Sequence, residues 1–230
     1  MGTFIAIEGG DGSGKGTQTK LLVEYLRSIG KDVLQLSFPR YGQDSAYYVE
    51  RYLNGEYGSA EDVPAELGTL PYALDRFAAK SEIELQLAKP NGIVISDRYM
   101  ASNLAHQGTK VVSKHARQLF YNRTLKTEYE ILQIPRPSLN IVLLVPPSTS
   151  QKNVDKKDKR VYTDKKRDIH EADESHLERA KSNYEELCVV YPHEFTSIHC
   201  TNSNDAMRSI EDIQKELLVQ VNGALARSTN

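Results

Sequence analysis

The glycine-rich stretch Gly9–Thr17 constrains the fold of this chain more strongly than any other segment. It contains the pattern G-x-x-x-x-G-K, which ends at Lys15. The apolar run Phe4–Ile7 before it is typical of a buried strand, and the apolar residues from Leu21 onward recur at helical spacing. A strand, a glycine turn and a helix in this order are the context in which such a pattern wraps a phosphate. The segment therefore predicts an α/β fold that binds a nucleoside triphosphate.

Each part of this loop has a physical role in holding phosphate. Glycines adopt positive φ without a Cβ penalty, so backbone N–H groups can surround an anion at the positive end of the following helix. Lys15 adds a positive charge where the β- and γ-phosphates would lie. The residues that we expect to contact the nucleotide are Gly9, Gly10, Asp11, Gly12, Ser13, Gly14, Lys15, Gly16 and Thr17. A tight connection without a ligand is the alternative for a glycine-rich turn, and the strand, the lysine and the helix argue against it.

Two residues depart from the usual loop. The position after the lysine, where the motif has a Ser or Thr for Mg²⁺, is Gly16. We therefore expect Mg²⁺ to be held mainly by phosphate oxygens, waters and a carboxylate elsewhere. Asp11 places a negative charge inside a phosphate cradle. That charge opposes nucleotide binding unless the side chain faces another group, such as a sugar hydroxyl.

The composition argues against several kinds of partner. The formal net charge of −2 gives no sign of a nucleic-acid or membrane partner. No apolar run approaches the roughly 20 residues that are needed to span a bilayer. Cys188 and Cys200 lack metal-site spacing and are typical of a protein of the reducing cytoplasm.

Strands alternate with helices along the chain, which predicts a doubly wound, five-stranded parallel sheet flanked by helices. The expected strands are Phe4–Ile7, Val33–Phe38, Ile93–Ile95, Ile141–Val145 and Phe195–His199. The expected helices include Lys15–Ile29, a long helix Ala65–Leu87 bent near Pro71, and a last amphipathic helix Asp205–Ala224. Linkers and repeats are absent from the sequence, so we expect a single domain over residues 1–230.

Arginines with aromatic neighbours follow the predicted strands or lie on the long helix. Arg40, Arg76 and Arg98 are each close in sequence to tyrosine or phenylalanine. Guanidinium groups suit bidentate phosphate contacts, and aromatic faces stack on bases. Each arginine alone would more often be a surface or salt-bridge residue. Grouped beyond strand ends, they indicate a second nucleotide site that holds a monophosphate, and hence phosphoryl transfer between two nucleotides.

A basic segment at about residues 151–170 interrupts the alternating pattern. It lies between the fourth strand and a helix, at the edge where a triphosphate would lie. A solvated, inert loop is one interpretation of such a charge run. We favour a mobile lid that closes over phosphates.

Four motifs in order resemble the thymidylate kinase family, whose members phosphorylate dTMP to dTDP with ATP. They are Glu8–Lys15, Phe38–Gly42, Ala73–Arg76 and Asp97–Asn103. The resemblance covers nearly the whole chain. It implies a Mg²⁺-dependent cytoplasmic kinase with ATP and dTMP as its small-molecule substrates, commonly a homodimer.

The resemblance also implies roles for individual residues. Asp11 matches a contact to the 3′-hydroxyl of the acceptor, and Asp97 matches a carboxylate near Mg²⁺. The implied acceptor site consists of Phe38 and Tyr72 around the thymine ring, Arg76 and Asn103 as polar readers of the base, and Arg40 and Arg98 at the phosphate. Tyr41 is a further expected substrate-binding residue. His106 stands where the family often has a larger aromatic residue that excludes ribonucleotides.

The family places a catalytic arginine either in the glycine loop or in the lid. Gly12 occupies the loop position, so the resemblance assigns this charge to the lid, with Arg160 and Arg167 as candidates. Asp168 and His170 lie in a stretch that resembles the Asp-x-aromatic-Glu signature of the family lid.

Two alternatives remain open from the sequence. The stretch from Gly12 to Gln18 also resembles the loop of adenylate kinases, so another nucleoside monophosphate kinase is the nearest alternative. A nucleotide-binding regulatory protein without turnover is the second. Comparing AMP with dTMP as the acceptor would test the first alternative. Loss of Lys15 or of the acceptor arginines would indicate the second, and all of these residues are present.

Overall fold

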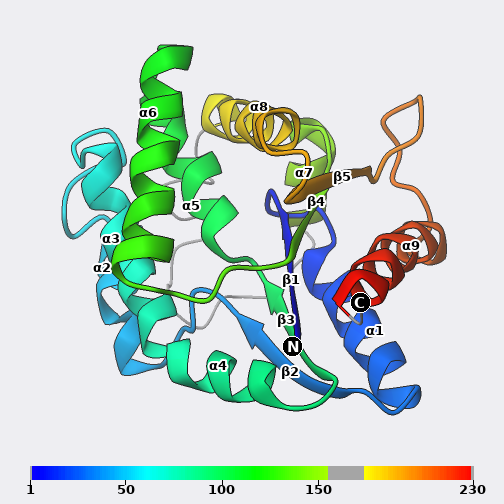
Figure 1. Cartoon of the computed structure of the whole chain (residues 1–230). Helices are drawn as coiled ribbons and strands as arrows, with labels where there is room; N and C mark the ends of the chain where they lie inside the picture. The colour runs from blue at the N-terminus through cyan, green and yellow to red at the C-terminus, as the bar shows by residue number, and fades with distance from the viewer. Residues whose placement is uncertain (1, 155–173, 229–230) are drawn as a thin grey trace.

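A computed structural model describes residues 2–154 and 174–228 of the chain. Its centre is a five-stranded sheet in the order β2-β3-β1-β4-β5, and all neighbouring strands are parallel (Figure 1). The strands are β1 (Thr3–Gly9), β2 (Asp32–Ser37), β3 (Gly92–Asp97), β4 (Leu139–Leu144) and β5 (Phe195–His199). The predicted doubly wound parallel sheet is confirmed, and β1 and β3 are each three residues longer than the predicted apolar runs.

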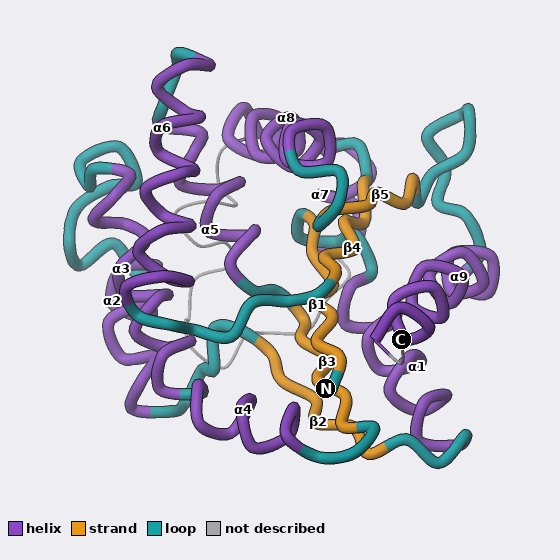
Figure 2. The backbone as a smooth tube through the Cα atoms, viewed as in Figure 1, coloured by secondary structure: helices purple, strands orange, loops and turns teal. Residues whose placement is uncertain are grey.

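Helices cover both faces of the sheet, as Figure 2 also shows. They are α1 (Lys15–Ser28), α2 (Tyr47–Leu53), α3 (Ala65–Ala78), α4 (Lys80–Ala88), α5 (Met100–Gln107), α6 (Lys114–Leu125), α7 (Pro147–Val154), α8 (Glu174–Val190) and α9 (Ile210–Ser228). Short segments η1 (Asp44–Ala46), η2 (Gly108–Lys110) and the π-helical η3 (Lys126–Ile131) join them.

Alternation along the buried strands divides the core into two layers. Ile5 and Ile7 of β1 face α1 and α9, where they join a cluster that includes Leu22 and Leu217. The intervening residues of β1 face the opposite side, with the cluster formed by α4, α5, α6 and α8. Because successive strand residues point to opposite faces, an apolar run without alternation becomes a strand buried on both sides.

The prediction of one continuous helix over Ala65–Leu87 is wrong. The chain forms two helices that separate at Ala79, while Pro71 lies inside α3. The N–H of Ala79 bonds to the Arg76 carbonyl at 3.1 Å, so the last turn of α3 tightens to an i→i+3 bond and ends there. Residue identity alone did not reveal this break.

The last helix starts five residues later than the predicted Asp205. Asp205 has a φ of 57°, and the chain before α9 forms a turn in which Thr201 and Met207 are bridged. The start of the predicted lid also differs, because residues 151–154 belong to α7. The rest of the lid prediction falls on residues 155–170, outside the described part of the chain.

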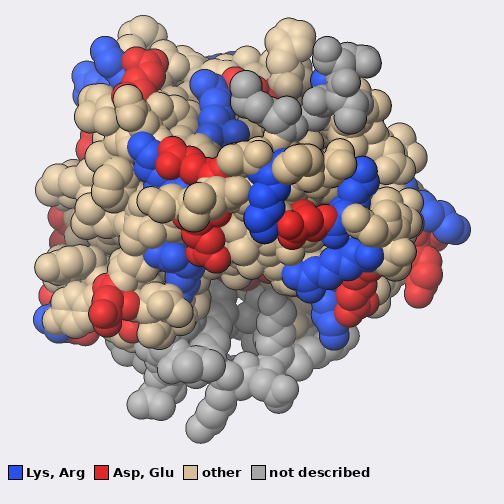
Figure 3. All heavy atoms as spheres, turned by 60° about the horizontal axis from the view of Figure 1, so that its bottom comes forward, with Lys and Arg blue, Asp and Glu red and all other residues tan. Residues whose placement is uncertain are grey.

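The functional edge of the sheet follows from its topology. β1 lies between β3 and β4, so the loops that leave β1 and β3 diverge where the strand order reverses. Crevices at the carboxyl ends of strands at such switch points are the usual ligand sites of open α/β sheets. On the face that Figure 3 shows, basic and acidic side chains are interspersed. Within the described residues, no helix is both long and apolar enough to cross a membrane.

Candidate active site

A cavity of about 340 Å³ lies beyond the carboxyl ends of β1, β2 and β3. Most of the predicted site residues line it: Asp11, Gly12, Gly14, Lys15, Gly16, Phe38, Tyr41, Tyr72, Arg76, Asp97, Arg98, Asn103 and His106. Gly9, Gly10, Ser13, Thr17 and Arg40 are predicted site residues outside this lining. The glycine loop, the ends of β2 and β3, and helices α3 and α5 therefore surround one cavity.

The glycine loop has the backbone that only glycine adopts easily. Gly12 and Gly14 have φ of 75° and 90°, and Lys15 begins α1 directly after them. Lys15 is 7% exposed, and its Nζ donates to the Gly10 carbonyl at 2.6 Å. Ser13 Oγ is buried without a hydrogen-bond partner among the described residues. The loop thus gathers backbone donors, a cation and a spare hydroxyl at the positive end of a helix.

Helix α7 packs against this loop, which sequence reasoning did not foresee. Asn153 Nδ2 donates to the Gly12 carbonyl at 2.9 Å, and Ser150 Oγ donates to the Asp11 carbonyl. A Cβ at Gly12 would lie 2.4 Å from the Ser150 carbonyl oxygen. Gly12 is therefore required both by its φ and by the close approach of α7.

Arg98 connects the end of β3 to the loop after β1. Its Nη1 donates to the Gly9 carbonyl at 3.0 Å and to Ser102 Oγ at 3.1 Å, and its Nη2 pairs with Asp11. Burial opposes the charge, but the carboxylate of Asp11 raises the pKa of Arg98 well above its ordinary value. The guanidinium therefore stays charged at the cavity wall.

Glu8 lies behind the cavity lining, where it contacts Tyr99 and Ser102, and the sequence analysis assigned it no role. It is fully buried, accepts the Tyr99 N–H at 2.8 Å and accepts from Ser102 Oγ at 2.6 Å. Burial raises its pKa, while the hydrogen bond from Ser102 and the charge of Arg98 oppose that shift. Since Ser102 also receives the Arg98 bond, Glu8 holds that arginine through one intervening hydroxyl. No local signal other than a lone acid at the end of an apolar run could have indicated this.

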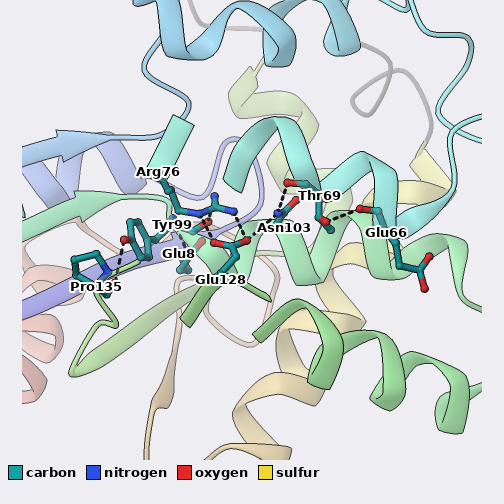
Figure 4. A network of polar contacts seen from close by, with 8 residues as sticks. All are labelled: Glu8, Glu66, Thr69, Arg76, Tyr99, Asn103, Glu128 and Pro135. Carbon is teal, nitrogen blue, oxygen red and sulfur yellow. Dashed lines mark hydrogen bonds and ion pairs between the residues drawn. The ribbon is translucent and has the colours of Figure 1, made fainter. Parts of the chain in front are cut away.

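Arg76 is fully buried, and Figure 4 shows its contact with Glu128. Its Nε and Nη2 donate to the two carboxylate oxygens of Glu128 at 2.7 and 2.6 Å. Asn103 Nδ2 donates to the Thr69 carbonyl at 3.1 Å and to Glu128 at 3.3 Å, which leaves Asn103 Oδ1 buried without a partner among described residues. Burial lowers the pKa of Arg76, and Glu128 outweighs it, so the net shift is upward. One carboxylate thus orients both predicted base-reading residues.

Arg40 is turned toward Asp75 and not toward the cavity lining. Its Nε donates to Asp75 Oδ1 at 3.0 Å, and its Nη2 donates to Ser45 Oγ at 2.8 Å. Asp75 also accepts the Arg40 backbone N–H at 2.8 Å. This arrangement fixes the loop after β2 against α3.

Aromatic side chains form part of the cavity wall. Phe38 packs edge-on against Tyr99 with ring centroids 5.3 Å apart, and Tyr72 packs against Tyr52 at 6.2 Å. His106 lies 3.2 Å from His176, nitrogen to nitrogen, so an imidazole of α8 contacts the cavity wall. Such faces suit the stacking of a planar ring.

Asp97 is a carboxylate of the cavity lining at the end of β3. It is half-buried, and its Oδ2 lies 3.4 Å from where a Cβ of Gly16 would be, so it faces the first turn of α1. The described residues contain no cluster of His, Cys, Asp or Glu that could hold a metal without other ligands. The predicted lid residues Arg160, Arg167, Asp168 and His170 lie outside the described residues.

Comparison with known proteins gives a consistent result. Residues 7–216 match the family model described as thymidylate kinase. A thymidylate kinase of Plasmodium falciparum is 31% identical over 221 residues, which are 96% of this chain and 90% of the relative. A thymidylate kinase of Mycobacterium tuberculosis is 36% identical over 143 residues, and this match spans 62% of the chain and 65% of the relative's length.

A solved structure with a similar fold supports the architecture. The thymidylate kinase from Ehrlichia chaffeensis superposes with a TM-score of 0.64 at 20% sequence identity. The match covers 96% of this chain and 98% of that chain.

Proposed function

The chain belongs to the thymidylate kinase family, and from this premise we propose that it transfers the γ-phosphoryl group of ATP to dTMP, giving dTDP and ADP. The observation that carries the proposal is the cavity of about 340 Å³, which is lined both by the glycine loop with Lys15 and by arginine, amide and aromatic groups of α3, α5 and the β3 end. A donor triphosphate and an acceptor monophosphate could bind in this cavity at the same time, with their phosphates next to each other.

We assign the donor to the glycine loop and the acceptor to the opposite wall. Lys15 and the loop amides would hold the ATP phosphates, while Arg98 would hold the dTMP phosphate in line for attack. Arg40 would reach the same phosphate only after exchanging its Asp75 partner. Phosphoryl transfer needs mainly positioning and charge stabilisation. The acceptor phosphate is already ionised at neutral pH, so no general base is assigned.

Recognition of thymine would fall to Phe38, Tyr72, Arg76 and Asn103. The unpartnered Asn103 Oδ1 suits an N–H of a pyrimidine ring, because the Asn103 amide nitrogen is already committed to Thr69 and Glu128. Asp11 would accept from a sugar hydroxyl of the acceptor.

The residues present also fit a Mg²⁺ ion. Mg²⁺ is commonly held by one or two carboxylates together with substrate phosphates and waters, and Asp97 supplies one carboxylate beside the loop. Bound there, the ion would neutralise phosphate charge during transfer. We further propose that Arg160 or Arg167 supplies positive charge from the lid.

The proposal is tested by steady-state kinetics with ATP, Mg²⁺ and a panel of dTMP, dUMP, dCMP and AMP. We expect dTMP to give the highest kcat/KM, and Lys15→Ala to lose turnover while keeping its far-UV circular dichroism spectrum. A preference for AMP would favour the adenylate kinase alternative. Absence of turnover with every acceptor would favour a regulatory nucleotide-binding protein.

We also propose that two copies associate through α3. Its residues Leu67, Leu70, Leu74 and Phe77 are exposed and spaced by three or four positions, so they form one apolar stripe. Light scattering should give a dimer for the wild type and a monomer for Leu70→Glu/Leu74→Glu. A monomeric wild type at micromolar concentration would contradict this. A cytoplasmic location is proposed from the two free thiols Cys188 and Cys200.

A further inference from the structure

A lysine outside the candidate active site carries an inference about chemical modification of this protein. Lys110 is the last residue of η2, is half-buried and does not line the cavity. Lysine amines are normally protonated at neutral pH, and a protonated amine has no lone pair with which to attack an electrophile. The groups around the amine therefore decide whether it can react.

Both groups that contact this amine are uncharged. Lys110 Nζ donates to the Val63 carbonyl at 2.7 Å and to Tyr52 Oη at 3.0 Å. Tyr52 keeps its own proton, because its hydroxyl donates to Gln107 Oε1 at 3.2 Å. An unprotonated amine has two N–H groups, so these two acceptors satisfy both of them and leave the nitrogen lone pair for another reaction.

The described residues around Lys110 provide no opposite charge. None of their carboxylates forms an ion pair with it, and burial alone lowers its pKa from 10.5 to about 8. The ring of Tyr52 adds little stabilisation of a cation. Nζ lies 5.5 Å from the ring centroid but 3.0 Å from the hydroxyl oxygen, so the nitrogen is at the hydroxyl edge of the ring. Burial without an opposite charge favours the unprotonated amine.

The lower basicity changes how much reactive amine is present. At pH 8, about half of an amine with a pKa of about 8 is unprotonated, against about 0.3% of an amine with a pKa of 10.5. A less basic amine is also a weaker nucleophile, which offsets part of this gain. We therefore expect Lys110 to react about five- to twentyfold faster than an ordinary lysine, since desolvation is a general way of activating a lysine amine.

We propose that Lys110 is a modification site, at which the unprotonated Nζ takes an acyl group from an activated donor, either a thioester or an acyl phosphate. The nitrogen lone pair forms a bond to the acyl carbon, the bond from that carbon to sulfur or to the phosphate oxygen breaks, and a thiolate or a phosphate leaves. The proton that the nitrogen loses passes to water. The product is an uncharged amide with one N–H, so modification breaks the contact with either Val63 or Tyr52.

Lys89 is the matched control, because exposure and basicity predict opposite orders of reaction for the two lysines. Its Nζ contacts Asp32 Oδ2 at 2.9 Å and Gln86 Oε1 at 2.8 Å, and its side chain is 50% exposed. If access to the reagent governs the rate, Lys89 reacts before the half-buried Lys110. If the unprotonated fraction governs the rate, Lys110 reacts first.

The test incubates the folded, full-length chain at pH 8 with acetyl-CoA in one arm and with acetyl phosphate in the other. Peptide mass spectrometry follows the acetylation of each lysine over time. We expect Lys110 to be acetylated about five- to twentyfold faster than Lys89 in at least one arm, and that arm identifies the donor. The rate at Lys110 should level off above about pH 8, whereas the rate at Lys89 should still rise at pH 9.5.

The same reaction in concentrated urea separates the folded contacts from the local sequence. The two lysines should then react at similar rates, because unfolding removes the burial of Lys110. Equal rates in the folded chain in both arms, or a faster Lys89, overturn the inference. An advantage of Lys110 that persists in urea also overturns it. These outcomes do not depend on dTMP turnover, so they leave the proposed function to its own test.

Discussion

Replacing Glu128 by glutamine tests whether Arg76 is held for recognition or only for stability. The pair is buried, with side chains 2% and 1% exposed, and it has two hydrogen bonds of 2.7 and 2.6 Å. Removing one charge of a buried pair leaves the other uncompensated, which costs about 3–5 kcal/mol. For a chain of this size each kcal/mol shifts Tm by about 2–4 °C, so Glu128→Gln should lower Tm by about 6–20 °C.

A double variant separates the two roles of Arg76. Apolar replacements of similar volume often restore the stability of a broken buried pair, so Arg76→Met/Glu128→Met should recover most of the lost Tm. It should still show a KM for dTMP raised about tenfold or more, because the loss of a hydrogen bond to a charged group costs about 1.5–3 kcal/mol. The measurements are scanning calorimetry and steady-state kinetics on the same preparations. Recovery of both Tm and KM would show that Arg76 serves the fold alone, and an unchanged Tm in Glu128→Gln would refute the buried pair.

Three further predictions follow from the lid, the glycine loop and a buried lysine. Arg160→Ala or Arg167→Ala should lower kcat by about a hundredfold with little effect on dTMP affinity, and wild-type kcat in both would exclude a lid charge. Gly12→Ala should lower Tm more than Gly14→Ala, since both have positive φ but only Gly12 meets a backbone oxygen, at 2.4 Å; equal losses would refute the α7 contact. Burial lowers the pKa of Lys110 from 10.5 to about 8, so between these pH values the unfolded chain binds more protons than the folded chain. The free energy of unfolding of wild type, measured relative to Lys110→Met by urea titration, should therefore rise from pH 7 to pH 9.5. A difference independent of pH would contradict that shift.

Local sequence patterns predicted the strands, turns and helices that form from the spacing of apolar residues and the placement of glycines within one segment. An apolar run, a glycine turn and an apolar helical repeat determine β1, the loop and α1 without reference to the rest of the chain. Parallel topology then brings Asp97 and Arg98 beside the glycine loop, because the carboxyl ends of β1 and β3 are neighbours. These are the parts of the candidate site that the sequence predicted best.

The missed features depend on contacts between distant segments. Glu128 lies 52 residues from Arg76, and its pattern of neighbours does not distinguish a buried carboxylate from an exposed one. Ser150 approaches Gly12 across 138 positions of chain, so the need for glycine there is visible only in three dimensions. The separation of α3 from α4 at Ala79 likewise follows from a tightened last turn and not from Pro71.

The ion pair between Asp11 and Arg98 places a carboxylate in competition with any small anion that approaches this arginine. A free phosphate ion that approaches Arg98 must compete with a carboxylate that is already covalently part of the protein, and so present at a high effective concentration. A nucleotide can donate a hydrogen bond from a sugar hydroxyl to the Asp11 carboxylate in place of the bond from Arg98. Inorganic phosphate and pyrophosphate have no such sugar hydroxyl. If the proposed acceptor site is correct, we expect a complete nucleotide to displace this pair more readily than inorganic phosphate does.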